Sequence, residues 1–204
     1  MAKKVKTNTD TSTEEKIKSA ARKVFMQKGY AATRTRDIAE ESGINLALLN
    51  YYFRSKEKLF NEIMMEKMQQ FFGILLPIVN DPTTKLETKI ELIVANYIDM
   101  LSANPDLPLF VLSEMKGQSG KIKKILPVQK VTDKISFIKQ LKERRPDINP
   151  MHFFMNILGM TVFPFVAKPA LELIAATNKN QLEAMLQERK KLIPVWVKAM
   201  LKAK

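Results

Sequence analysis

The sequence predicts an all-α protein of about nine helices, from its apolar periodicity, its helix-capping residues and its few glycines. Apolar side chains recur at spacings of three and four residues, which is typical of amphipathic helices rather than strands. The 204 residues include only six glycines, and no block repeats along the chain. Hydrophobic residues make up 46% of the sequence, which is enough for a sizeable core.

The first expected helix follows a polar tail at residues 1–11, which we expect to be flexible. Ser12 and Glu15 have the spacing of a capping box, which predicts the start of the helix. Gly29 supplies a left-handed C-cap and predicts its end. Between them lies one apolar stripe, formed by Ile17, Ala20, Ala21, Val24 and Phe25.

Two short helices are expected next, joined by a tight turn. Thr33 can cap the first of them, which ends before Gly43, and Asn45 can cap the second, at residues 46–52. Glycine suits position 43 because the connection requires a positive φ, which strains a residue with a Cβ. This arrangement predicts a helix-turn-helix, a motif whose second helix enters the major groove of DNA with its N-terminal half.

The rest of the chain predicts a larger helical body. A long fourth helix opens at Ser55, and Pro77 and Asp81-Pro82 are expected to end it. Further helices are expected at residues 86–103, 109–115, 121–143 with a break near Pro127, 149–166 and 180–202. The helix at 151–166 is apolar on nearly every face, so one side can face the core and the other a partner subunit.

Composition excludes several classes of function. The formal charge is +13, which favours DNA but also suits membrane surfaces and acidic proteins. The chain has no cysteine, and His152 is its only histidine, so we expect no metal site. No catalytic constellation or glycine-rich cofactor loop occurs, which predicts a protein that is not an enzyme and has no cofactor. No signal peptide or long apolar run occurs, so a soluble, cytoplasmic protein is expected.

Four short motifs carry a resemblance to a known family. They are Gly29-Tyr30-Ala31-Ala32-Thr33, Arg36-Asp37-Ile38-Ala39, Ser42-Gly43-Ile44 and Tyr52-Phe53-Arg54-Ser55-Lys56-Glu57-Lys58-Leu59. In order and spacing they resemble the DNA-binding head of the TetR family of transcriptional regulators, over about 45 residues. The resemblance implies a three-helix DNA-binding domain at residues 12–55, joined by the long helix to a ligand-binding and dimerisation domain at 56–204.

The resemblance also assigns roles in DNA binding. It implies phosphate contacts at the start of the second helix and near the start of the fourth, and base contacts from the third. The residues that it assigns are Thr33, Thr35, Arg36, Asn45, Leu46, Ala47, Asn50, Tyr51, Tyr52 and Lys56. Asn50 stands where many relatives have tyrosine, and its amide could contact adenine.

For the larger domain, the resemblance implies a dimer around a two-fold axis and a pocket for a small-molecule inducer, apolar or amphiphilic. The candidate pocket residues are Met68, Phe72, Met115, Phe154 and Leu158. The candidate interface residues are Phe153, Met160, Phe163, Met185, Ile193 and Trp196. The function expected is that of a repressor that binds a palindromic operator in double-stranded DNA. The alternative is a helical protein that uses its basic charge to bind other proteins or a membrane surface.

Overall fold

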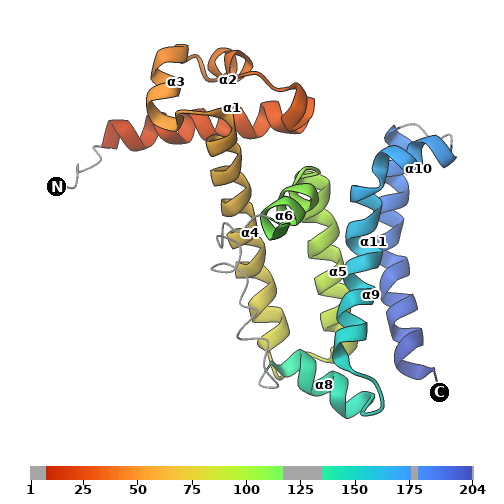
Figure 1. The fold of residues 1–204 in the computed structure, drawn as a ribbon. Helices are drawn as coiled ribbons and strands as arrows, with labels where there is room; N and C mark the ends of the chain where they lie inside the picture. Colours follow the sequence, from red (N-terminus) through yellow and green to blue (C-terminus); the bar gives the residue numbers. More distant parts are fainter. Residues whose placement is uncertain (1–7, 117–134, 176–178, 204) are drawn as a thin grey trace. The chain divides into compact units, whose positions relative to one another are not determined.

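The computed structural model describes residues 8–116, 135–175 and 179–203, which form ten α-helices and no strand (Figure 1). The predicted all-α class is therefore confirmed. The chain divides into two compact units, Met1–Lys67 and Met68–Lys204, and the boundary between them falls inside helix α4. The functional division predicted after residue 55 stays a prediction.

The first unit contains α1 (Asn8–Ala32), α2 (Thr35–Ser42), α3 (Leu46–Phe53) and the start of α4 (Lys56–Asn80). Helix α1 begins before Ser12, so the capping box predicted there is wrong. Gly29 breaks the helical geometry of α1 with φ 73° and ψ 166°, a conformation that favours glycine. It is not the left-handed C-cap that was predicted, and α1 continues to Ala32. One further helical turn follows it before the chain enters α2.

The core of the first unit joins α1 to the first turns of α4. Phe25 and Phe60 meet edge to face with ring centres 5.1 Å apart. Beside them, Lys18 and Arg22 of α1 bind the two carboxylate oxygens of Glu66 at 2.7 and 2.8 Å. Burial opposes ionisation of Glu66, but the hydrogen bonds from Lys18 and Arg22 outweigh it and lower the pKa of Glu66. The early part of α4 is thus packed as a member of the head.

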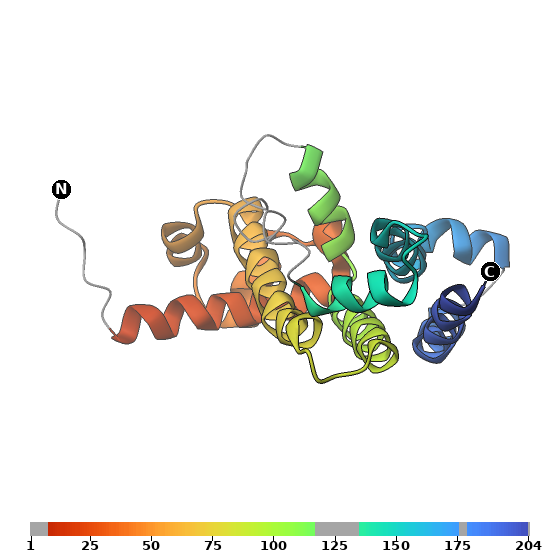
Figure 2. The ribbon, with the colours of Figure 1, turned by 90° about the horizontal axis from the view of Figure 1, so that it is seen from below.

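The second unit contains the rest of α4 and six further helices. These are α5 (Leu86–Ala103), α6 (Leu107–Lys116), α8 (Ser136–Arg144), α9 (Pro150–Val166), α10 (Lys168–Ala175) and α11 (Lys179–Lys202). Helices α5, α9 and α11 pack against one another (Figures 1 and 2). The helix predicted at 121–143 is seen only from residue 136, and its earlier part, with Pro127, lies outside the described residues. Helix α10 was not predicted.

Three prolines, Pro77, Pro164 and Pro194, lie inside helices. The prediction that Pro77 helps to end the fourth helix is wrong, whereas the stop predicted at Asp81-Pro82 is confirmed, because α4 ends at Asn80. Proline has no N–H, so Pro164 cannot bond the carbonyl of Met160 one turn earlier. Arg189 of α11 supplies the missing donor, since its Nη2 and Nε lie 2.9 and 3.3 Å from that oxygen. A contact between helices therefore replaces a bond within α9.

The helices of the described residues do not individually meet the requirements of a membrane span. None is by itself both long enough and apolar enough to cross a bilayer. Helices α9 and α10 together meet the length and composition requirements, but they are bent by 73° relative to each other.

Candidate DNA-binding surface and effector body

The turn between α2 and α3 has the predicted geometry. Gly43 has φ 62° and ψ 27°, and its N–H donates to the carbonyl of Glu40 at 3.1 Å. Ile38 of α2 and Leu49 of α3 are fully buried between the helices and the rest of the head. The prediction of a glycine turn is confirmed, and the two helices form a helix-turn-helix.

Helix α3 is capped by Asn45, whose Oδ1 accepts a hydrogen bond from the Leu48 N–H at 2.8 Å. The predicted cap is confirmed, and it commits this oxygen to the helix end. Ala47, Asn50 and Tyr51 are exposed on α3, and Leu46 is half-buried. Asn50 therefore presents its amide on the surface of the second helix of the motif, which is the helix that enters the major groove.

The amino end of α2 depends on Asp37, a residue that the sequence reasoning missed. Its carboxylate accepts the backbone N–H of Arg34 at 2.7 Å and lies 3.0 Å from the ammonium of Lys28. The backbone bond from Arg34 and then the bond from Lys28 lower the pKa of Asp37. Its position three residues after the N-cap is the spacing of a capping box, which could have revealed it. Beside it, Arg36 is exposed and Thr35 is half-buried.

Two residues assigned to phosphate binding have other contacts in the structure. Thr33 is only 2% exposed, and its hydroxyl donates to the carbonyl of Gly29 at 2.7 Å, so the phosphate role of this side chain is corrected. The ammonium of Lys56 donates to the carbonyls of Tyr30 and Thr33, each at 2.8 Å, and lies 4.3 Å from the centre of the Tyr30 ring. Two of its three N–H groups are thus committed within the head, and the predicted phosphate contact of Lys56 stays a prediction.

The two tyrosines at the end of α3 differ in exposure. Tyr51 is 66% exposed, whereas Tyr52 is half-buried, and their rings meet edge to face at 5.4 Å. Helix α3 then ends at Phe53, and its C-cap Arg54 has a positive φ of 53°. Ser55 follows, and its hydroxyl accepts the Lys58 N–H at 3.1 Å at the start of α4. Tyr51, Thr35 and Arg36 thus keep their predicted DNA roles as predictions.

The predicted dimer residues divide into a buried and an exposed set. Phe153 and Ile193 are 3% and 0% exposed, so they belong to the core of the subunit, and their assignment to the interface is corrected. Phe163, Met185 and Trp196 are 61%, 48% and 40% exposed, and Met160 is half-buried. Large apolar side chains therefore remain uncovered on α9 and α11.

The predicted pocket residues do not share one environment. Met68 is buried, Phe72 and Leu158 are half-buried, and the side chain of Met115 lies outside what the structure describes. Phe154 is 49% exposed, so it does not line an enclosed cavity in this structure, and its assignment is corrected. Adjacent helical residues point in different directions, which explains why Phe153 and Phe154 are reversed relative to the prediction.

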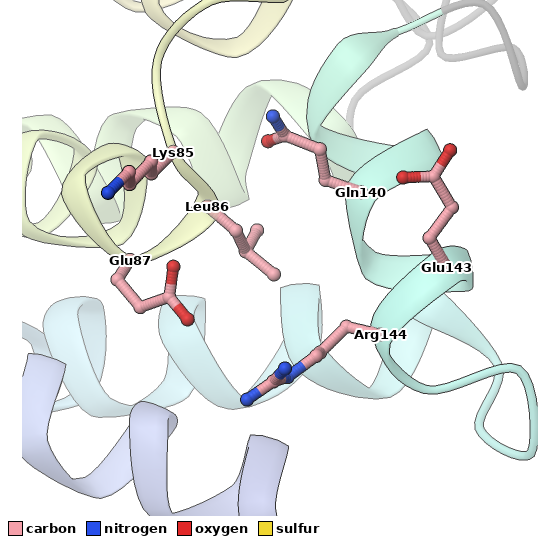
Figure 3. A pocket seen from close by; sticks show the side chains of 6 residues that line it. All are labelled: Lys85, Leu86, Glu87, Gln140, Glu143 and Arg144. Atoms are coloured by element: carbon pink, nitrogen blue, oxygen red, sulfur yellow. The ribbon is translucent and has the colours of Figure 1, made fainter.

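A depression of about 340 Å³ lies between the start of α5 and helix α8 (Figure 3). Its lining is largely polar and differs from the predicted pocket: it consists of Lys85, Leu86, Glu87, Gln140, Glu143 and Arg144. One turn after Lys85 in the chain lies the fully buried Lys89, and one turn before Gln140 lies Ser136. Lys89 donates a hydrogen bond to the Ser136 hydroxyl at 2.9 Å. Burial lowers the pKa of Lys89, although Asp81 opposes this effect.

The fold and the exposed α3 define a helix-turn-helix DNA-binding regulator. A family model described as "Bacterial regulatory proteins, tetR family" matches residues 17–63, which cover the motif and the helices around it. This match, together with relatives that extend over most of the chain, supports a TetR-family transcriptional regulator. Because its relatives are transcriptional regulators, it belongs with them and not with enzymes.

Relatives extend the similarity beyond the head. The probable HTH-type transcriptional regulator YttP of Bacillus subtilis is 24% identical over 161 residues, which are 76% of this chain and 78% of YttP. The fatty acid degradation regulator FadR of Bacillus halodurans has a similar fold, with a TM-score of 0.58 and 18% identity, over 94% of this chain and 97% of FadR. FadR of Bacillus subtilis, solved in complex with stearoyl-CoA, has a TM-score of 0.54 and 18% identity, over 87% of this chain and 96% of that FadR.

Proposed function

We propose that this regulator is a repressor that binds a near-palindromic operator as a homodimer and leaves it when an amphiphilic anion binds. The observation that carries the proposal is the exposed amide of Asn50 on a helix whose start is held by Asn45. Arg36 would contact phosphate beside it, and Tyr51 would contact the backbone at the other end of α3. As a regulator of transcription, the protein would act in the cytoplasm.

The dimer is supported by the exposed apolar side chains of α9 and α11. On α9, Met155 and Phe163 lie one turn before and one turn after Gly159, on the same face of the helix, and both side chains are exposed. Apart from its own helix backbone, a Cβ placed on Gly159 would have no atom of the described residues within 4 Å. A partner helix could approach closely at such a point, so we propose Gly159 as part of the two-fold interface.

The interface can be tested with one pair of substitutions. Gly73 on α4 is also exposed, and a Cβ there would likewise have no atom within 4 Å, so Gly73→Arg is a matched control for Gly159→Arg. Both changes add one charge and favour the helix. Sedimentation velocity should show that Gly159→Arg dissociates the dimer while Gly73→Arg does not. A Gly159→Arg protein that remains dimeric would exclude this face.

The inducer class is supported by relatives and by charge. FadR of Bacillus subtilis, a regulator of similar fold, was solved with stearoyl-CoA, and this chain carries a net charge of +13. We therefore propose a fatty acyl-CoA, which combines an apolar chain with anionic phosphates. Stearoyl-CoA should weaken operator binding, whereas coenzyme A without the acyl chain should not. Equal binding with and without stearoyl-CoA would exclude this class of ligand.

The decisive experiment is selection of random duplex DNA at about 150 mM salt, near physiological ionic strength. A palindromic enriched site would support the repressor, and Asn50→Ala should then relax one adenine preference by about 1–3 kcal/mol. Gln69→Ala removes an exposed amide from α4 and serves as the matched control. Salt-sensitive binding without an enriched motif would instead favour a protein that uses its charge for other partners.

A further inference from the structure

The ammonium of Lys56, at the start of α4, contacts residues 29–34, the segment between the break of α1 at Gly29 and the start of α2. Two of its three N–H groups donate to the carbonyls of Tyr30 and Thr33 at 2.8 Å, and the Tyr30 ring centre lies 4.3 Å away. We propose that Lys56 is a positioning residue that holds this segment in place for DNA binding, and that it does not contact phosphate. The inference rests on the proposed DNA-binding function.

The segment needs such support because its backbone leaves regular helix geometry. The φ of 73° at Gly29 breaks α1, and the carbonyl of Gly29 is bound by the Thr33 hydroxyl at 2.7 Å. Side chains thus bind three carbonyls of this short segment: Gly29, Tyr30 and Thr33. Carbonyls near a helix end lack partners within the helix and need such donors.

The Tyr30 ring packs against two further aromatic rings. Its centre lies 4.5 Å from the ring of Phe60 and 6.1 Å from that of Phe25, both of which are buried. Lys56 is therefore fixed on one side by the aromatic core and on the other by two backbone carbonyls. An ammonium is a compact donor on a flexible stem, whereas the guanidinium of arginine is planar and holds its donors in a fixed fork, so we do not expect arginine to reproduce both contacts.

The consequence for function concerns the residues that follow. Helix α2 begins at Thr35, two residues after the carbonyl of Thr33 that Lys56 holds, and Arg36 comes next. Substitution of Lys56 would release this connection and misplace the exposed guanidinium of Arg36. DNA affinity should then fall even though Lys56 itself makes no contact with phosphate.

Salt dependence separates positioning from phosphate contact. Each phosphate contact adds about 0.9 to the slope of log affinity against log salt, so removing one contact from each subunit of a dimer lowers the slope by about 1.8. With a random-sequence duplex as the probe, Lys56→Met should weaken binding about tenfold or more, as expected for removal of a charge-assisted hydrogen bond, with the slope unchanged. Lys56→Arg should not restore affinity. Arg36→Met, the control, should lower the slope.

A lower slope for Lys56→Met, together with recovery by Lys56→Arg, would overturn the proposal. If Lys56→Met does not fold, Tyr30→Leu tests the same point, because it keeps the backbone carbonyl and every charge. It should weaken DNA binding without a change of slope, and unchanged affinity would overturn the proposal.

A second measurement does not depend on DNA, so failure of the proposed DNA-binding function can be distinguished from failure of the role proposed for Lys56. In urea unfolding, the effects of Lys56→Met and Tyr30→Leu should be non-additive, since the two side chains share one contact. Additive effects would overturn the contact between them. A wild-type protein that binds no duplex would contradict the DNA-binding function and leave this cycle as the test of Lys56.

Discussion

The carbonyl of Met160 accepts hydrogen bonds from Arg189 in place of the one that Pro164 cannot donate. The contribution of this contact to stability can be tested. The guanidinium also lies 5.3 Å from the centre of the Trp196 ring. We consider Arg189→Met, which keeps an apolar stem of similar length but removes every donor. It should leave the Met160 carbonyl without its partner and remove the contact with the indole.

The expected cost follows from these contacts. A hydrogen bond to a charged group contributes about 1.5–3 kcal/mol, and an exposed cation–π contact adds about 0.5–1 kcal/mol. Arg189→Met should therefore lower the free energy of unfolding by about 2–4 kcal/mol. For a chain of this length, that corresponds to a fall in Tm of roughly 4–16 °C. Arg144→Met removes an exposed arginine from α8 and should cost much less.

Pro164→Ala provides the decisive comparison because it restores a backbone N–H that can bond Met160 within α9. In that background, Arg189→Met should cost only the cation–π part, about 0.5–1 kcal/mol. The four proteins form a double-mutant cycle, measured by urea unfolding at one protein concentration. The cycle cancels the cost of the cavity that the smaller alanine leaves, because both Pro164→Ala proteins carry it. Equal costs of Arg189→Met in both backgrounds would refute the reasoning.

Three further predictions concern the cap of α3, an acidic turn and a buried lysine. Asn45→Ala should lower the free energy of unfolding of the head by about 0.5–2 kcal/mol in urea and should weaken DNA binding. Asn45→Ser should change neither, because serine can still cap the helix. Hydrogen bonds from the Thr84 hydroxyl and then from Thr83 lower the pKa of Asp81 to about 2. The stability that these hydrogen bonds contribute is present above the unfolded pKa of about 3.9 and is lost as the pH falls through about 2. Asp81→Asn should therefore destabilise the protein at neutral pH and progressively less in acid, which urea unfolding at a series of pH values would measure. Lys89→Met should leave the free energy of unfolding unchanged or raise it by about 1 kcal/mol or more, because it removes a buried charge; a large decrease in urea would contradict this.

Features of the head that depend on neighbouring residues were predictable from the sequence. The Gly43 turn needs only a residue that tolerates a positive φ, and the Asn45 cap needs only an acceptor three residues before Leu48. Both interactions close within four positions of the chain, so the amino-acid order itself specifies them.

Features that depend on distant parts of the chain could not be predicted in the same way. Lys56 binds carbonyls 23 and 26 residues earlier, whereas the family resemblance implied only a phosphate contact for it. Arg189 meets the carbonyl of Met160 across 29 residues. No local pattern marks these pairs, because the backbone path must first bring the partners together.

Helix α9 shows the same division between sequence and tertiary structure. Its composition predicts a helix that must be covered on more than one side, but Phe153 and Phe154 are equally apolar. The structure buries Phe153 and leaves Phe154 exposed. Side chains one residue apart on a helix point about 100° away from each other, so only the position of α5 and α11 decides which of them enters the core. The apolar character of α9 follows from its composition alone, whereas its packing partners decide which face stays exposed.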